Sequence, residues 1–342
     1  MYNFTNDYSE GAHPRILNKL IETNLEQDLG YGDDKYSVEA RELLRQKMDN
    51  PNAAIYFVSG GTQANLLVIS SLLHVHEAAI CANTGHIFVH EAGAIEAVGH
   101  RVISIDSEDG KLNPTAIRQM LQEYTLRPHV VKPRLVYISN STEIGTIYSR
   151  AELQALSDFC RSEGLLLFMD GARLGHALTA EDNDLTLSVI AELTDVFYVG
   201  GTKNGALLGE AIVFNNPDLA PEFDYVVKQK GALLAKGRVL GIQFSELFRD
   251  DLYFDLARHA NRMAMKLSKA ISEQGYSFLS PSSTNQIFPI LPHALIKKLS
   301  EKYLFYEWQV MDEQHSAIRL ITSWATDESV VEKFVGELRI EN

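Results

Sequence analysis

Short runs of β-branched and aromatic residues recur along most of the chain, separated by longer stretches with helical periodicity. Seven of these runs are apolar almost without interruption, as is typical of strands that are covered on both faces. They are residues 55–58, 79–82, 102–105, 135–139, 165–169, 196–199 and 211–214. Because such strands alternate with helical stretches, the pattern predicts an α/β fold with a mostly parallel sheet.

Start and stop signals mark two of the intervening helices. Ser149 and Glu152 have the spacing of a capping box ahead of an apolar stretch, and Gly164 is a suitable stop. Asn113 followed by Pro114 predicts another helix start, because the Asn side chain caps free N–H groups and proline fits the first helical turn. We therefore expect helices that begin directly after Ser149 and Asn113.

The pattern changes in the last quarter of the chain. Residues 250–274 have the periodicity of one long helix. Strand-like runs follow, with a helix expected on either side of the middle run, at residues 286–290, 305–310 and 318–322. Since 342 residues exceed one typical domain, we expect an N-terminal segment and large domain over 1–245 and a small α+β domain over 246–342.

The composition narrows the range of partners. Hydrophobic residues make up 45% of the chain and charged residues 22%, the balance of an ordinary globular protein. The formal net charge of −14 disfavours a nucleic acid or an anionic membrane surface, because phosphates would be repelled. No window reaches the roughly 18 apolar residues that a transmembrane helix needs. We expect no nucleic-acid and no membrane partner, whereas a small anionic ligand remains compatible with a locally positive site.

Cysteine usage and the N-terminus bear on location. Cys81 and Cys160 are far apart and lack metal-ligand spacing, so we expect them to be small core residues and exclude a disulfide framework. The sequence MYNFTNDYSEGAHPR has no basic region followed by an apolar stretch, so we expect no signal peptide. Together these observations predict a cytoplasmic protein.

The first stretch with chemical potential is the glycine turn Ser59-Gly60-Gly61-Thr62, which follows a predicted strand and opens a predicted helix. Glycines let backbone N–H groups approach an anion, and the helix dipole favours negative charge at that end. Thr62 adds a hydroxyl donor. The stretch lacks the P-loop and dinucleotide spacings, and a plain strand-to-helix turn explains the glycines equally well. Phosphate binding and a structural turn therefore both stay open here.

The second stretch ends the apolar run 165–169 with Asp170. Ligands of α/β folds bind at such strand ends. A carboxylate there is costly unless it meets a cation or a donor, and a protonated pyridine nitrogen is one such partner. Arg173 carries a planar fork suited to a carboxylate or phosphate. An internal Asp170–Arg173 pair or a helix cap is the structural alternative, and this pattern does not decide between them.

The third stretch places Lys203 after the strand 196–199, among glycines and beside Thr202. Most lysines are solvated surface residues, but this run is too apolar and too rich in glycine for that. A desolvated lysine has a lowered pKa and becomes a nucleophilic amine that can form an imine. The order of glycine turn, strand-end aspartate and strand-end lysine makes the three signals support one another.

The fourth stretch contains His86, His90 and Glu91. Histidines four residues apart can bind a metal on a helix, but Glu91 follows the second histidine, so the HExxH pattern is absent and no further ligands stand out. We therefore expect no metal. A neutral imidazole stacked on a flat aromatic cofactor explains His86 better, and His90 is more simply a buried, hydrogen-bonded polar residue.

Taken together, these stretches resemble the threonine aldolase/β-eliminating lyase group of the fold-type I enzymes that use pyridoxal 5′-phosphate (PLP). The resemblance covers nearly the whole chain. Its motifs stand in the family's order at residues 30–34, 61–65, 86 with 91–93, 170–173, 202–203 and 318–320. It implies the fold-type I architecture of PLP-dependent transferases, a large domain with a mostly parallel sheet and a small C-terminal α+β domain.

The resemblance also implies how the cofactor is held. Lys203 would bind PLP as a Schiff base, Asp170 would keep the pyridine nitrogen protonated, and His86 would stack on the ring. These three residues are the expected catalytic set. The remaining cofactor contacts, most of them to the phosphate, would come from Gly60, Gly61, Thr62, Arg173 and Thr202.

The same resemblance assigns the substrate site and the assembly. Arg173 and Arg319 would bind the substrate carboxylate, and Tyr31 would line the site of a neighbouring subunit in a homodimer or homotetramer. Two positions depart from the family. Asn6 stands where many members have a serine near the carboxylate, and Glu143 stands where some have a histidine beside the substrate hydroxyl. Both departures leave the substrate preference open.

The implied activity is cleavage of the Cα–Cβ bond of a β-hydroxy-α-amino acid, threonine or allo-threonine, to glycine and an aldehyde. The alternative within enzymes is a β-eliminating lyase that acts on an aromatic or sulfur-containing amino acid. From another class, a catalytically silent PLP-binding protein would keep the same motifs. His86, Glu143 acting through water, and water alone are the three options for the base that takes the hydroxyl proton.

Overall fold

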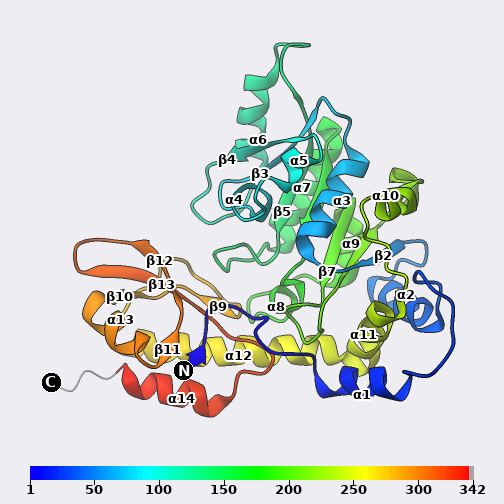
Figure 1. The fold of residues 1–342 in the computed structure, drawn as a ribbon. Helices are drawn as coiled ribbons and strands as arrows, with labels where there is room; N and C mark the ends of the chain where they lie inside the picture. The colour runs from blue at the N-terminus through cyan, green and yellow to red at the C-terminus, as the bar shows by residue number, and fades with distance from the viewer. Residues whose placement is uncertain (339–342) are drawn as a thin grey trace.

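The computed structural model describes residues 1–338 and has a seven-stranded sheet between two layers of helices, with a smaller sheet beside it (Figure 1). The strand order is β2-β8-β7-β6-β5-β3-β4. Strand β8 runs antiparallel to both neighbours, and the other pairs are parallel. The strands are β2 (Ala54–Val58), β3 (Glu77–Ala82), β4 (Arg101–Ile105), β5 (Lys132–Ser139), β6 (Leu166–Asp170), β7 (Val196–Gly200) and β8 (Glu210–Phe214). The predicted mostly parallel α/β sheet is confirmed.

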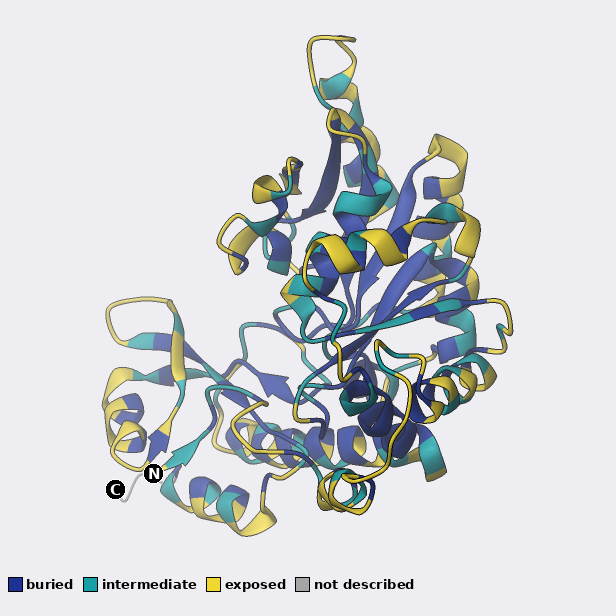
Figure 2. Cartoon of the chain, turned by 45° about the vertical axis from the view of Figure 1, so that its right-hand side comes forward, coloured by how far each residue is buried: buried dark blue, intermediate teal, exposed yellow. Residues whose placement is uncertain are grey.

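Successive residues of these strands enter two separate apolar cores. In β6, Leu167 and Met169 join one core and Phe168 joins the other, because neighbouring side chains of a strand point to opposite faces. The first core is covered by α2 (Lys35–Met48), α6 (Pro114–Leu121), α7 (Arg150–Glu163), α9 (Leu187–Leu193) and α11 (Arg238–Phe248). The second is covered by α3 (Gly61–Leu72), α5 (Ala94–Ala97) and α10 (Phe223–Gln229). Figure 2 shows the strands buried between these layers, which explains their nearly unbroken apolar character.

The helix signals of the sequence act as expected. At α7 the Ser149 side chain accepts from the backbone of Glu152, the reciprocal contact of the capping box is present, and Gly164 ends the helix with φ 65°. At α6 the Asn113 side chain accepts from the N–H of Ala116, ahead of the first-turn proline. Both predicted starts are confirmed.

The C-terminal part is built on the long helix α12 (Leu252–Glu273), which lies beneath both sheets (Figure 1). Its other elements are β9 (Gln286–Ile287), β10 (Ile290–Pro292), α13 (His293–Ser300), β12 (Tyr306–Val310), β13 (His315–Ile321) and α14 (Glu328–Glu337). The prediction of a helix between the last two strands is wrong. There Asp312 accepts from the N–H groups of Gln314 and His315, which closes a tight turn between β12 and β13.

The start of the chain packs into this C-terminal part. Strand β1 (Tyr2–Asn3) pairs in parallel with β11 (Tyr303–Leu304), and Phe4 is fully buried in the C-terminal core. The N–H of Ile321 also donates to the Phe4 carbonyl at 2.9 Å. Helix α1 (Pro14–Glu22) then contacts α11. Within residues 1–338, no helix combines the length and apolar character needed to cross a membrane.

Candidate active site

The carboxyl ends of β2, β6 and β7 meet at one edge of the large sheet and border a hollow of about 300 Å³. The glycine turn follows β2, Asp170 ends β6, and Lys203 lies in the loop after β7. The hollow is lined, among others, by Ser59, Gly60, Gly61, Thr62, His86, Glu143, Asp170, Arg173, Thr202 and Lys203. The residues that the sequence predicted for cofactor binding therefore face one common space.

The glycine turn presents backbone N–H groups to this space. Helix α3 begins at Gly61 with Gly60 as its N-cap, and glycine has no side chain that could cap the helix. A Cβ built on Gly60 meets nothing within 4 Å, so the turn borders open room, whereas a Cβ on Gly61 would come within 3.0 Å of the Tyr198 hydroxyl. Uncapped N–H groups at a helix start bind anions. The turn can therefore hold a phosphate.

Asp170 is held as a carboxylate in a buried position. The N–H of Ala172 donates to its Oδ1 at 2.9 Å, and the hydroxyl of Tyr137 donates to its Oδ2. Burial alone would raise the pKa of Asp170, but the charge of His86 and these hydrogen bonds outweigh burial and lower it. The result is a fixed negative charge at the strand end, the partner that a protonated ring nitrogen needs.

His86 belongs to the same network. It begins the short helix α4 (His86–Val89), and its Nδ1 lies 2.8 Å from Oε1 of the buried Glu91. The Asn65 amide donates to Glu91 at 2.7 Å and reaches Asp170 at 3.3 Å. Burial opposes the charged form of His86, yet the bond to Glu91 and the charge of Asp170 raise its pKa. The hydrogen bond to Glu91 thus fixes the orientation of the His86 imidazole.

Lys203 provides the amine of the site. Burial lowers its pKa, and the charge of Arg173 lowers it further, while the carboxylates of Asp7 and Asp170 act in the opposite direction. A lowered pKa increases the fraction of uncharged amine, the form that attacks an aldehyde. This agrees with the expectation drawn from its apolar, glycine-rich surroundings.

Arg173 has a partner that the sequence did not suggest. Its Nε and Nη2 donate to the two oxygens of Asp7 at 2.7 and 3.1 Å, and Asp7 is fully buried. The Asn285 amide donates to the same carboxylate at 2.9 Å. The internal Asp170–Arg173 pair left open by the sequence is therefore not formed. One edge of the guanidinium is occupied by Asp7, and Nη1 carries none of these bonds.

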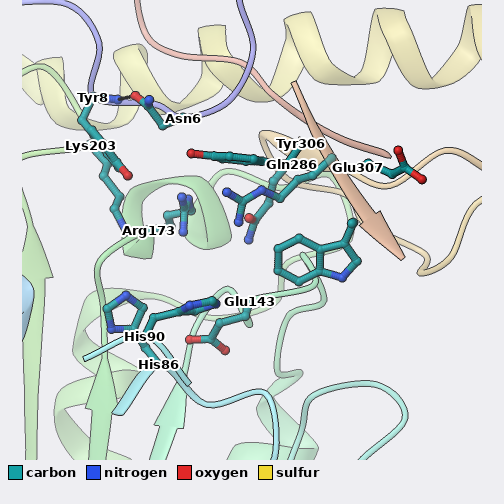
Figure 3. Close-up of a pocket in the computed structure, with 12 residues that line it drawn as sticks. Asn6, Tyr8, His86, His90, Glu143, Arg173, Lys203, Gln286, Tyr306 and Glu307 are labelled. Carbon is teal, nitrogen blue, oxygen red and sulfur yellow. Dashed lines mark hydrogen bonds between the residues drawn. The ribbon is translucent and has the colours of Figure 1, made fainter. Parts of the chain in front are cut away.

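A second, larger hollow of about 490 Å³ adjoins the first and shares His86, Glu143, Arg173 and Lys203 with it. Figure 3 shows Asn6 and Tyr8 on one side of this pocket and His86, His90 and Glu143 on the opposite side. The guanidinium of Arg319 lies 5.2 Å from the ring centre of Tyr306 and 4.8 Å from that of Trp308. These contacts hold a second cation in place beside the first.

Glu143, which the sequence suggested for the substrate site, lines both hollows. Ser139 donates to its Oε1 at 2.9 Å. Burial raises the pKa of Glu143, and the negative charge of Asp170 adds to this effect. A carboxyl group with a raised pKa holds a proton more readily than an ordinary glutamate, which makes it a candidate for acid–base chemistry.

Tyr31 is the one predicted site residue that lies elsewhere. It is half exposed, has φ 60°, and lines a different hollow together with Arg41 and Asp224. The ammonium of Lys228 lies 4.7 Å from its ring centre. Tyr31 therefore takes no part in the site of its own subunit, and its role in a neighbouring subunit stays a prediction.

Several residues that line or support the site were not predicted from the sequence. The buried ones around the predicted residues are Asp7, Asn65, Tyr137, Tyr198, Glu210 and Asn285, and the ones along the pocket wall are Tyr8, Tyr306 and Trp308. Asp7 and Asn65 stand inside stretches that the sequence had singled out. Glu91 was noted for its spacing from the histidines and as part of the motif at 91–93 but not as the partner of His86, although a carboxylate that hydrogen-bonds to an imidazole commonly orients it.

The chain is similar to known proteins over nearly its whole length. Residues 7–293 match the family model described as Beta-eliminating lyase. A low specificity L-threonine aldolase of Pseudomonas aeruginosa is 34% identical over 98% of this chain and 97% of its own length. A threonine aldolase structure from Leishmania major is 45% identical with a TM-score of 0.97, and the match covers 99% of this chain and 98% of that one.

More distant structures define the class. A Thermus thermophilus aspartate aminotransferase covers 99% of this chain and 91% of its own with a TM-score of 0.72 at 14% identity, a likeness that shows the fold alone. The fold is therefore fold type I, as the resemblance implied, and Lys203 and Asp170 line one hollow at the edge of its sheet. Within this class, the chain belongs to the beta-eliminating lyase family, which includes the threonine aldolases it matches along nearly its whole length.

Proposed function

We propose that the protein is a PLP-dependent aldolase that cleaves the Cα–Cβ bond of a β-hydroxy-α-amino acid, threonine or allo-threonine, to glycine and an aldehyde. The observation that carries this proposal is that Lys203, Asp170 and the glycine turn line one hollow, with two arginines in the hollow beside it. The names of the relatives that match over full length support the same activity.

The residues present fit PLP. The turn at Gly60 borders open room, and the buried hydroxyl of Ser141, which also lines the hollow, has no hydrogen-bond partner among residues 1–338. The phosphate would bind at the turn, the amine of Lys203 would hold the aldehyde carbon, and Asp170 would hold the ring nitrogen. When bound, PLP supplies the electron sink for the bond that breaks.

The protein's own contribution is the choice of that bond. Arg173 and Arg319 would bind the substrate carboxylate, and the rings of Tyr306 and Trp308 contact the guanidinium of Arg319. Fixing the carboxylate fixes rotation about the bond from nitrogen to Cα, so that the Cα–Cβ bond takes the reactive orientation. The proton of the β-hydroxyl would pass to Glu143, to His86 or to water.

The assay that tests the proposal incubates the purified protein with threonine and with allo-threonine and measures acetaldehyde and glycine. Formation of both products, and their loss in Lys203→Ala, is the expected result. Formation of 2-oxobutanoate and ammonia from threonine, or of pyruvate and ammonia from an aromatic or sulfur-containing amino acid, without glycine from threonine, would assign the protein to the β-eliminating lyases instead. A colourless protein without either activity would contradict both readings.

Assembly, location and domain division are part of the same proposal. A homodimer or homotetramer would bring Tyr31 of one subunit to the site of another, which agrees with its exposure and its absence from the site of its own subunit. A cytoplasmic location and a division into residues 1–245 and 246–342 complete it. Cross-linking of the purified protein, followed by sizing, tests the assembly.

A further inference from the structure

Glu210 is a buried carboxyl group that the proposed reaction leaves unused. It begins β8 and lies in register with Val58 of β2 on one side and with Gly200 of β7 on the other. Val58 directly precedes the glycine turn, and Gly200 directly precedes the loop that carries Lys203. Glu210 therefore stands between the two chain segments that form the floor of the cofactor hollow, and it lines that hollow.

Glu210 contacts the loop that carries Lys203. The residue is only 4% exposed, the N–H of Gly201 donates to its Oε2 at 3.1 Å, and the Thr202 side chain hydrogen-bonds to it. The ionisable groups that act on it in the described part of the chain are Lys203, Asp170, Tyr198 and Tyr253. Among these groups only Lys203 can carry positive charge, and burial lowers its pKa.

A negative charge at this place conflicts with a phosphate. Two anions in one partly desolvated hollow repel each other, and the usual outcome is that the weaker acid takes up a proton. A carboxylic acid, unlike a carboxylate, has an O–H that can donate to an anion. The same side chain can thus oppose or support phosphate binding, depending on its protonation.

We propose that Glu210 is a positioning residue of the phosphate site, which is uncharged when an anion occupies the glycine turn and then presents an acid O–H to the hollow. This inference rests on the proposed function in one respect, namely that the glycine turn binds a phosphate. Burial raises the pKa of Glu210 to about 8, although the bond from Thr202 and the charge of Lys203 partly oppose this. The neutral form is therefore already favoured at neutral pH, and a bound anion favours it further.

The test measures binding of inorganic phosphate and of PLP to the apoprotein by calorimetry between about pH 6.5 and pH 9.5. Because the anion binds the protonated form of Glu210, affinity falls as the pH rises through the pKa of this group. Glu210→Gln keeps an acceptor for Gly201 and a permanent N–H donor, so it lacks this dependence. We expect the wild-type protein to lose about thirtyfold more phosphate affinity than E210Q over this range.

The matched control is Glu77→Gln, which changes a buried carboxyl on β3 that pairs with Lys132 outside the hollow. This variant should follow the wild-type pH dependence. E210Q with the wild-type dependence would overturn the inference. A wild-type protein that binds neither phosphate nor PLP at any pH would instead refute the proposed function.

If E210Q fails to fold, the wild-type protein still decides the question. Adding phosphate to the apoprotein at about pH 8.5 should increase the infrared band of a protonated carboxylic acid, because anion binding draws a proton onto Glu210. No change in this band, with phosphate bound, would overturn the inference.

Discussion

Replacing Asp7 with Asn tests the ion pair that holds Arg173. Asp7 is fully buried and the Arg173 side chain is 13% exposed, with two hydrogen bonds between them. Removing one partner of such a pair leaves an uncompensated buried charge and typically costs about 3–5 kcal/mol. Because Asn keeps the volume and one acceptor, we expect a loss near the lower end, about 3 kcal/mol of unfolding free energy.

The pH dependence of this loss separates the ion pair from simple packing. The charge of Arg173 and its hydrogen bonds outweigh burial and hold the pKa of Asp7 well below its usual range. Its stabilising contribution is therefore complete above the ordinary aspartate pKa of about 4. It is lost as the pH falls through the lowered pKa of the folded state. The difference between wild type and D7N should stay constant near neutral pH and shrink in acid.

Equilibrium denaturation with urea at fixed protein concentration measures this difference. Asp255→Asn is the control, because Asp255 pairs with Arg258 on the exposed face of α12 and such pairs contribute about 0–1 kcal/mol. A D7N variant that is as stable as D255N, or a difference that does not change with pH, would refute the reasoning. Weaker binding of glycine by D7N, at unchanged PLP binding, would link the pair to the substrate site.

Three further predictions concern the proposed chemistry. Lys203→Ala should lose both the visible absorbance of the bound cofactor and all turnover, and an unchanged spectrum would remove the central assignment. Asp170→Asn should keep PLP but lower kcat by about 10²–10³, the range for removing one preorganised electrostatic contact. A near-normal rate would exclude that role. Because the pKa of Glu143 is raised and a base must be ionised, Glu143→Gln should abolish the acid limb of the pH–rate profile. A retained limb would point to His86.

The sheet and the central site residues could be predicted because their signals are local. A run such as 165–169 is apolar since both faces of the sheet are covered, and the polar residue after it, Asp170, must then lie at the sheet edge. Lys203 could be placed in the same way, because it follows the apolar run 196–199. The Ser149 capping box is likewise read within four residues, and all of these positions agree with the structure.

The remaining features depend on contacts between distant segments. Asp7 and Arg173 are 166 positions apart, and nothing near either residue indicates the other. Glu210 enters the hollow because β8 runs against its neighbours, which places the start of that strand beside the ends of β2 and β7. The helix predicted before β13 does not form, for a local reason. The Asp312 side chain accepts from two backbone N–H groups and closes a turn, which the hydrophobic periodicity did not reveal.

The pairing of β1 with β11 has a consequence for how the protein is made. The ribosome makes Tyr2 and Asn3 well before Tyr303 and Leu304, against which they pair. Domains fold as units as the chain emerges, so the large sheet can form while residues 1–8 still lack their partner strand. The segment that carries Asp7, and with it the restraint on Arg173, is therefore secured only after residues 303–304 have been synthesised.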